Sequence, residues 1–277
     1  MKRIVTVQDI SCIGKCSLTV ALPIISAMGV EAAVVPTAVL STHTAFKGFT
    51  FRDLTSDIKP ISEHWKQEKL GFDAIYTGYL GSFEQLEIVS EFFDDFKTAD
   101  NMIIVDPVMG DFGKLYPGFT QEFADKMAEL CGKADIIVPN MTEASFMLGL
   151  EYKENYDEAY VKAILKKLCE KGAKKAVLTG INYVEGKIGV MCYDSQTDSY
   201  FTYFQDKVNA SYHGTGDVFA STLTGALAKE FSFEDSLKIA VDYTVECIKA
   251  TNEDKNSRWY GVNFEETIPY LINRIKN

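Results

Sequence analysis

The chain has 277 residues, 47% of them hydrophobic and 24% charged, and its formal net charge is −11. This length is enough to bury the core of one large domain or of two small ones. The negative charge disfavours nucleic acid and anionic membranes as partners, and no apolar run approaches the roughly 20 residues that a membrane-spanning helix needs.

The cysteines and the first residues together predict a cytoplasmic protein. Six cysteines are scattered without the spacing of a small disulfide-bonded domain, which predicts reduced thiols. None of the three histidines lies at zinc-site spacing from the pair Cys12 and Cys16. Residues 1–8 hold only a short apolar run before a polar residue, so they predict a strand rather than a signal peptide.

Short β-rich runs alternate with longer helical patterns along the chain. The expected strands cover residues 4–8, 31–36, 73–78, 102–106, 135–139 and 175–180. The expected helices cover residues 16–28, 62–70, 83–96, 121–131, 143–148, 157–171, 218–229, 233–250 and 265–275. This alternation predicts an α/β fold with a mostly parallel central sheet and helices on both of its faces.

Two segments depart from the alternation. Residues 187–193 and 200–204 flank a polar turn and predict an antiparallel hairpin at one edge of the sheet. Residues 46–59 mix polar and aromatic side chains, so this segment is either a mobile flap over an active site or an irregular connection. Because no linker or internal repeat interrupts the sequence, residues 1–277 are expected to form a single domain.

Polar residues recur where the expected strands end. Ligands of open parallel sheets bind at the carboxyl ends of the strands, so these residues predict one continuous site along that edge. Three of them, Asp106, Asn140 and Glu143, carry the oxygen ligands that Mg²⁺ accepts, often through water. The same residue types also form turns and helix caps, and the sequence leaves both interpretations open.

The stretch from His213 to Asp217 reads His-Gly-Thr-Gly-Asp and runs into a helix of small apolar residues. Glycines next to a helix start can form a cradle of backbone N–H groups for a phosphate. Asp217 stands where a carboxylate can take the proton of a hydroxyl that attacks that phosphate. The alternative is a glycine-rich loop in which Asp217 only caps the helix. Lys15, Lys187 and Lys207 are further candidate cations.

These motifs resemble those of the ribokinase-like kinases of small molecules, and most closely those of the pyridoxal kinase branch. The resemblance extends over nearly the whole chain in order and spacing. It is carried by Ser41-Thr-His-Thr44, Thr77-Gly-Tyr-Leu-Gly-Ser82, Asp106-Pro-Val-Met-Gly110, Pro139-Asn140 with Glu143, and His213-Gly-Thr-Gly-Asp217. Hydroxymethylpyrimidine kinases share the block at 106–109 and the glycine loop, whereas the blocks at 41–44 and 78–82 favour pyridoxal kinase.

The resemblance implies a three-layer α/β/α fold, ATP as co-substrate, Mg²⁺ and K⁺ as ions, a homodimer, and phosphorylation of the 5′-hydroxymethyl group of a B6 vitamer. By position, Asp217 resembles the catalytic base, and Gly214, Thr215 and Gly216 the anion hole. The residues that resemble the substrate-binding set are Asp9, Thr37, His43, Thr44 and Tyr79. Those that resemble the nucleotide-binding set are Asp106, Asn140, Glu143 and Thr179, with Asp106 and Glu143 near the metal through water.

One position departs from the family pattern. Pyridoxal kinases commonly carry serine where this chain has Asp9. A carboxylate there can pair with a protonated pyridine nitrogen or a 4′-amino group, which favours pyridoxamine or pyridoxine over pyridoxal. The alternative is that Asp9 only caps the helix that starts near residues 14–17. Two other functions stay open: a kinase of hydroxymethylpyrimidine or another small alcohol, and a non-catalytic binding protein on the same fold.

Overall fold

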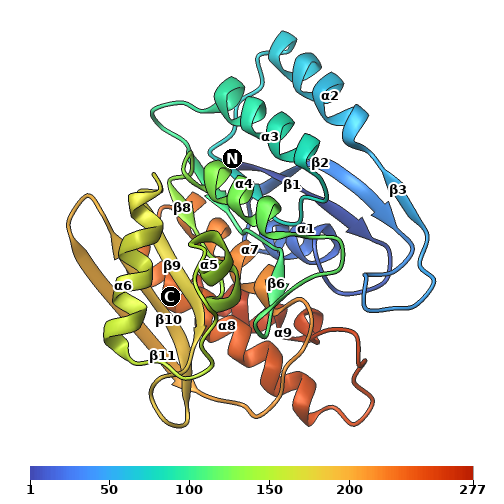
Figure 1. Ribbon diagram of the computed structural model, residues 1–277. Coiled ribbons are helices and arrows are strands. Elements are labelled where there is room, and N and C mark those ends of the chain that lie inside the picture. Colours follow the sequence, from blue (N-terminus) through green and yellow to red (C-terminus); the bar gives the residue numbers. More distant parts are fainter. Residues whose placement is uncertain (277) are drawn as a thin grey trace. The chain divides into compact units, whose positions relative to one another are not determined.

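The computed structural model describes residues 1–276, which form two compact units. Unit 1 consists of Met1–Gly78 together with residues 207–276, and unit 2 consists of Tyr79–Asp206. The first unit therefore joins both ends of the chain, and the second is a continuous central segment (Figure 1).

Unit 1 contains four strands in the order β4 (Ala74–Thr77), β1 (Arg3–Ser11), β2 (Glu31–Leu40) and β3 (Phe51–Asp53). β1 runs parallel to both β2 and β4, and β3 pairs antiparallel with β2. The interior of β1 is fully buried, as expected for a parallel strand that is covered on both faces. A register shift next to Asp9 marks a bulge at the carboxyl end of β1.

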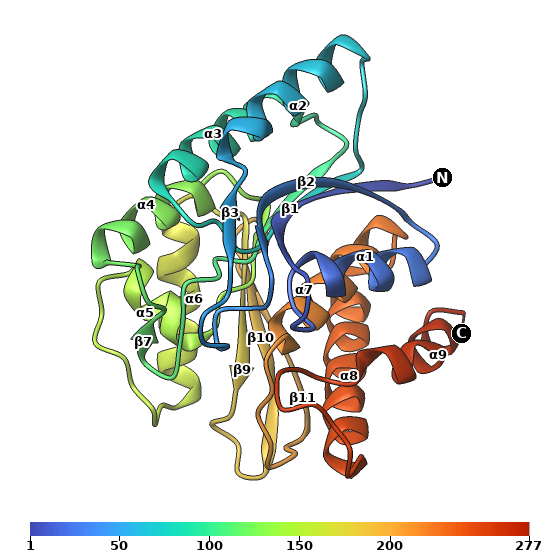
Figure 2. The ribbon, with the colours of Figure 1, turned by 90° about the vertical axis from the view of Figure 1, so that its right-hand side faces the viewer.

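The helices of unit 1 are α1 (Leu18–Ala27), α2 (Thr55–Gln67), α7 (Thr215–Ala228), α8 (Phe233–Glu253) and α9 (Phe264–Arg274). α1 packs on α7, α7 on α8, and α8 on α9, while α2 packs on β2. Figure 2 shows α2 and α1 on opposite sides of β1 and β2, so this unit has three layers. Small residues along α7 allow this close packing.

The sheet of unit 2 contains five strands in the order β11 (Ser199–Asp206), β10 (Lys187–Asp194), β9 (Lys175–Ile181), β8 (Ile136–Ile137) and β5 (Met102–Val105). β5, β8 and β9 are parallel, whereas β10 pairs antiparallel with β9 and with β11. The predicted edge hairpin is therefore confirmed. The structure adds a small hairpin, β6 (Gly110–Asp111) with β7 (Lys114–Leu115), that the sequence analysis did not predict.

Four helices belong to unit 2: α3 (Phe83–Phe96), α4 (Gln121–Cys131), α5 (Met141–Met147) and α6 (Glu158–Glu170). They pack in series, α3 on α4, α4 on α5 and α5 on α6, and α6 also covers β9 and β10. α5 begins just beyond β8, which places the first turn of this helix at the carboxyl end of a parallel strand.

The segment 46–59 is the place where the element prediction was least accurate. Residues Phe51–Asp53 form β3, and α2 begins at Thr55 rather than at residue 62. Proline lacks the N–H that an interior helical position uses, so Pro60 is unusual inside a helix. The helix nevertheless continues through Pro60. The flap interpretation of this segment stays a prediction.

No helix within residues 1–276 is both long enough and apolar enough to span a bilayer. All six cysteines lie within these residues, and each is a free thiol.

Candidate active site

The start of α7 has the backbone geometry of an anion cradle. Gly214 precedes the helix in the left-handed conformation, with φ 82° and ψ 0°, and provides no capping side chain. A Cβ atom at this position would lie 2.0 Å from the Lys15 carbonyl oxygen, so only glycine fits. The N–H groups of the first turn, from Thr215 to Asp217, have no partner further back in the helix and can bind a phosphate.

Asp217 is the third residue of α7 and keeps part of its side chain exposed. Burial and, to a smaller extent, the nearby charge of Asp9 raise the pKa of its carboxyl to about 7, while hydrogen bonds from the backbone N–H groups of Ser17 and of Asp217 itself oppose the shift. A carboxyl with a pKa near neutrality suits a general base, because it is partly ionised at working pH and still holds a proton firmly.

Asp9 lies buried at the bulge that ends β1. Its Oδ2 accepts a hydrogen bond from the Ser11 hydroxyl at 2.9 Å, and its Oδ1 accepts one from the Ser17 hydroxyl at 2.5 Å. Burial raises the pKa of Asp9, and these two hydroxyls act against that rise. Asp9 therefore meets α1 through the side chain of Ser17, the residue that precedes this helix.

His43 lies buried in a cluster of aromatic side chains of unit 1. Its Nε2 lies 3.0 Å from the Tyr260 carbonyl oxygen, and its Nδ1 accepts a hydrogen bond from the Ala45 N–H at 3.1 Å. These partners require the neutral tautomer with the proton on Nε2, and burial lowers the pKa of the ring. The His213 ring lies 4.9 Å away and the Phe46 ring 5.0 Å away. Thr44 is exposed, whereas Thr37 is fully buried in β2.

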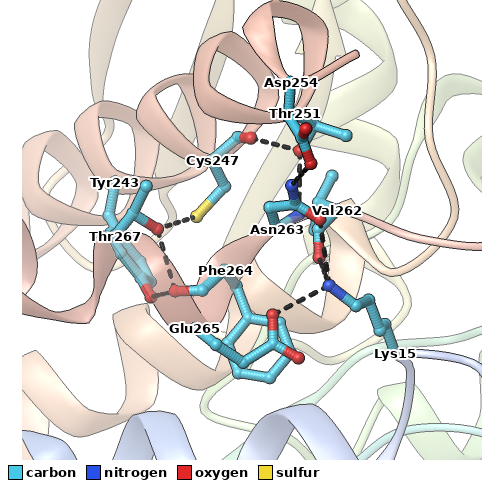
Figure 3. A network of polar contacts seen from close by, with 10 residues as sticks. All are labelled: Lys15, Tyr243, Cys247, Thr251, Asp254, Val262, Asn263, Phe264, Glu265 and Thr267. Carbon is cyan, nitrogen blue, oxygen red and sulfur yellow. Dashed lines mark hydrogen bonds and ion pairs between the residues drawn. The ribbon is translucent and has the colours of Figure 1, made fainter. Parts of the chain in front are cut away.

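Lys15 is held by three oxygen atoms of the segment that leads into α9 (Figure 3). Its Nζ donates to the Val262 carbonyl at 3.1 Å, to Asn263 Oδ1 at 3.1 Å and to Glu265 Oε2 at 2.9 Å. The sequence analysis considered Lys15 only as a spare cation for phosphate. In the structure, the Lys15 side chain joins the loop before α1 to residues 262–265, close to the other end of the chain.

Hydrogen bonds from α8 and α9 hold the same segment in place (Figure 3). Asn263 donates to Asp254 through its side chain at 3.0 Å and to Thr251 Oγ1 through its backbone at 2.8 Å. Tyr243 donates to the Phe264 carbonyl at 2.9 Å. Gly261 lies in close contact with Lys15, since a Cβ atom there would lie 2.6 Å from the Lys15 Cβ.

In unit 2, Asn140 and Glu143 form a reciprocal capping box at the start of α5. The Glu143 N–H donates to Asn140 Oδ1 at 2.9 Å, and the Asn140 N–H donates to Glu143 Oε2 at 2.8 Å. Glu143 Oε1 also accepts a hydrogen bond from the Met109 N–H at 3.2 Å. Burial raises the pKa of Glu143 to about 8, and these N–H groups oppose the rise. The capping interpretation of Asn140 is therefore confirmed.

Thr179 and Asp106 lie near this capping box within unit 2. Thr179 forms a parallel bridge with Asn140, and its N–H donates to the Pro139 carbonyl at 3.0 Å. Asp106 is buried, and its charge, together with that of Glu143, helps to raise the pKa of the Cys131 thiol. The ring of Tyr79 lies against Phe119, with 5.7 Å between ring centroids.

The predicted site residues thus fall into two groups, one in each unit. Unit 1 holds Asp9, Thr37, His43, Thr44 and the four residues from Gly214 to Asp217, and unit 2 holds Tyr79, Asp106, Asn140, Glu143 and Thr179. Ser17 and Lys15 are the contacts that the sequence analysis missed. The partners of Lys15 and the Asp217 partner of Ser17 lie far away along the chain, so these contacts have no local signal.

Residues 1–276 contain no cluster of three or more histidine, cysteine, aspartate or glutamate side chains that could cage a metal. Magnesium at phosphate-transfer sites takes one or two carboxylates and completes its shell with phosphate oxygens and water. Asp106 and Glu143 fit that pattern. Burial raises the pKa of Glu143 to about 8, and a nearby cation would favour its ionised form.

Comparison with known proteins locates this architecture among kinases of small heterocyclic alcohols. The sequence profile of the phosphomethylpyrimidine kinase family matches residues 21–261. A solved structure from Bacteroides thetaiotaomicron, provisionally called a phosphomethylpyrimidine kinase and crystallised with pyridoxal, is 39% identical. It superimposes with a TM-score of 0.92 and covers 98% of this chain and 95% of that one.

Pyridoxal kinase from Lactobacillus plantarum is 28% identical, with a TM-score of 0.90 over 100% of this chain and 98% of that one. This match confirms the predicted fold class and the predicted resemblance to pyridoxal kinases. The pyridoxine kinase of Bacillus subtilis is 29% identical over 185 residues, and the match covers 65% of each protein. Other curated relatives include both pyridoxal kinases and hydroxymethylpyrimidine kinases.

Proposed function

Because the chain belongs to the phosphomethylpyrimidine kinase family, we propose that it uses ATP to phosphorylate the 5′-hydroxymethyl group of a B6 vitamer. The observation that carries this proposal is the glycine cradle at the start of α7 with Asp217 in its first turn. A protein that only binds a ligand needs no such base, which argues against the non-catalytic alternative.

In the proposed mechanism, Asp217 accepts the hydroxyl proton as the substrate oxygen attacks the γ-phosphorus in line. The N–H groups of Thr215 and Gly216 and the left-handed turn at Gly214 form the anion hole that stabilises the charge on the transferring phosphoryl group. The base and the anion hole act through positioning and electrostatic stabilisation, which are the main contributions of a protein to phosphoryl transfer. The pKa of Asp217, which is raised to about 7, supports its proposed role as the general base, because the carboxyl can change between its ionised and protonated forms near neutral pH.

The pyridine ring is proposed to lie near Asp9, Thr37, His43, Thr44 and Tyr79. The nucleotide is proposed to lie near Asp106, Asn140, Glu143 and Thr179. Mg²⁺ would be held by Asp106 and Glu143, largely through water, and would neutralise charge on the ATP phosphates. Burial of both carboxyls supports this assignment, since a cation favours their ionised forms. We also propose K⁺ as a helper ion, a cytoplasmic homodimer, one catalytic domain over residues 1–277, and a flap at 46–59.

A second candidate is a hydroxymethylpyrimidine kinase, because the matching family and several relatives carry that activity in their names. The deciding experiment measures ATP-dependent phosphorylation of pyridoxal, pyridoxamine, pyridoxine and hydroxymethylpyrimidine side by side. The proposal expects the highest kcat/KM with one of the three vitamers. A higher kcat/KM with hydroxymethylpyrimidine would favour the second candidate, and ATP turnover that no alcohol stimulates would contradict both.

The choice among vitamers is proposed to depend on Asp9. Its carboxylate would favour a substrate with a protonated ring nitrogen or a 4′-amino group. The test is the ratio of kcat/KM for pyridoxamine to that for pyridoxal, in the wild type and in Asp9→Ser. A lower ratio in the variant is expected, and an unchanged ratio would remove Asp9 from the choice.

A further inference from the structure

Ser17 combines three unusual properties. It is buried, it lies directly before α1, and its backbone has φ 51° and ψ −135°. This φ lies in the left-handed region, where a residue with a Cβ atom is strained. Lys15, two residues earlier, also has a positive φ of 53°. Strain of this kind persists only where surrounding contacts hold the backbone in place.

The contacts of Ser17 link two acidic residues. Its hydroxyl donates to Asp9 Oδ1 at 2.5 Å, and its backbone N–H donates to the Asp217 carboxylate. The direction of the N–H is set by the strained backbone of Ser17, and the hydroxyl bond to Asp9 is one of the contacts that hold this backbone in place. The rest of the loop from Cys12 to Ser17 is anchored independently, because Lys15 Nζ is bound by three oxygens beyond α8.

We infer that Ser17 is a positioning residue for the proposed base, and that its Asp9-bound side chain aims the backbone N–H at the ionised Asp217 carboxylate. This inference rests on the proposed function, in which Asp217 takes the substrate proton. A hydrogen bond to the ionised form stabilises that form, so Ser17 keeps the base available at lower pH. Ser17 itself touches no reacting atom in this scheme.

The charged surroundings of Asp217 within the described residues are simple. β1 contributes Asp9, whose charge disfavours ionisation of Asp217, and the segment before α1 contributes the Cys16 thiol. The thiol stays protonated, because burial and both carboxylates raise its pKa. α8 and β4 also pack in this region, and no charged group from either enters the set that shifts the pKa of Asp217.

The chain offers a matched pair of variants. Ser17→Ala and Ser11→Ala each remove one buried hydroxyl that donates to Asp9, at 2.5 Å and 2.9 Å. Only Ser17 also contacts Asp217. The readout is the titration of the Asp217 carboxyl, followed by ¹³C NMR of the full-length protein labelled at aspartate. The resonance is assigned as the one that disappears in Asp217→Asn.

Ser17→Ala is expected to raise the titration midpoint of Asp217 by about one pH unit, because the ionised form loses an aligned donor. The acid limb of kcat/KM should move up by the same amount, with the KM for ATP unchanged. Ser11→Ala should shift the titration midpoint of Asp217 and the acid limb of kcat/KM by less than a third of the shift expected for Ser17→Ala. If Ser17→Ala does not fold, Ser17→Gly takes its place, since glycine is unstrained at this φ.

An unmoved midpoint in the Ser17 variant, or an equal shift in Ser11→Ala, would overturn the inference. In the second case the effect would come through the charge of Asp9 and not through the N–H. A protein that shows the expected NMR shift and phosphorylates none of the vitamers would overturn the proposed function while supporting the contact between Ser17 and Asp217.

Discussion

The helices α5 and α7 both have an acidic residue in the first turn, but the two residues have different hydrogen-bond partners. In each helix the third residue is an acidic side chain, Glu143 in α5 and Asp217 in α7, and burial raises the pKa of each. The acidic charge also lies near the positive end of the helix dipole in both cases. Position in the helix and pKa therefore do not distinguish the two carboxyls.

Their hydrogen bonds do distinguish them. Glu143 accepts backbone N–H groups on both oxygens and completes a capping box with Asn140. Asp217 follows a glycine that offers no side-chain cap, and its carboxyl accepts hydrogen bonds from its own backbone N–H and from that of Ser17, which lies outside its helix. The first arrangement stabilises the local fold, and the second leaves the helix start available to a ligand. Substitutions at the two helix starts should therefore affect different measurements.

The largest expected effect is that of Asp217→Asn on turnover. Loss of a general base should lower kcat by a factor of about 10² or more, with little change in the KM for ATP. Asp235→Asn is the matched control, because Asp235 is the third residue of α8 and is exposed. Near-normal turnover in Asp217→Asn would show that Asp217 is not the general base.

Gly214→Ala should impair both activity and stability. The added Cβ would lie 2.0 Å from the Lys15 carbonyl oxygen, and φ is 82°. We expect kcat to fall about tenfold or more and the free energy of unfolding to fall by ~2 kcal/mol. Gly29→Ala separates strain from collision, because Gly29 has φ 78° with nothing within 4 Å of an added Cβ. Equal effects of the two variants in urea unfolding would discount the contact with Lys15.

Glu143→Ala should act first on stability. It leaves the buried N–H group of Met109 and the partly buried N–H group of Asn140 without their acceptor, which costs about 1–3 kcal/mol of unfolding free energy at pH 7. The exposed Glu122, in the first turn of α4, provides the control, and Glu122→Ala should change stability by less than ~0.5 kcal/mol. If both variants unfold at the same urea concentration, the capping box contributes nothing measurable.

The last expected effect is a pH dependence of stability. The pKa of Asp217 is raised to about 7 in the fold, so the native state holds a proton that the unfolded chain releases near pH 4. Its contribution to stability is therefore greatest at low pH and declines as the pH rises towards 7. Asp217→Asn should be more stable than the wild type at pH 8, by roughly 2 kcal/mol after allowing for partial exposure.

Thermal unfolding of wild type and Asp217→Asn at pH 4.5 and pH 8 measures this difference. The gap in Tm should be clear at pH 8 and nearly absent at pH 4.5. A gap that does not change with pH would mean that the Asp217 carboxyl titrates at its ordinary value.

The regular elements were predictable because their signals are local. The periodic patterns placed α3 and α4 at their observed bounds, and alternating residues around a polar turn gave the β10–β11 hairpin. Asn140 and Glu143, three residues apart, also carry the sequence signature of a capping box. α2 was predicted to start at residue 62, whereas it starts at Thr55 and contains Pro60, a residue that is uncommon inside helices.

The contacts around Asp217 were not predictable, because they join distant segments or rare backbone conformations. Lys15 and Val262 lie 247 positions apart. Nothing in the sequence near Ser17 indicates a positive φ, since serine seldom adopts one. The sequence predicts which residues of unit 1 carry the chemistry, and only the structure shows which residues contact them.

Three glycines from different parts of unit 1 meet the chain at Gly14 and Lys15 with no room for a methyl group. An added Cβ would lie 2.6 Å from the His43 ring at Gly14, 2.0 Å from the Lys15 carbonyl at Gly214, and 2.6 Å from the Lys15 Cβ at Gly261. The neighbour is a backbone atom at Gly214 and a side-chain atom at Gly14 and Gly261, so these segments of unit 1 are closely packed. A displacement of the start of α7 would therefore also displace Lys15, which contacts Gly214 and Gly261. Because Gly14 precedes Lys15 and contacts His43, that side chain would move as well.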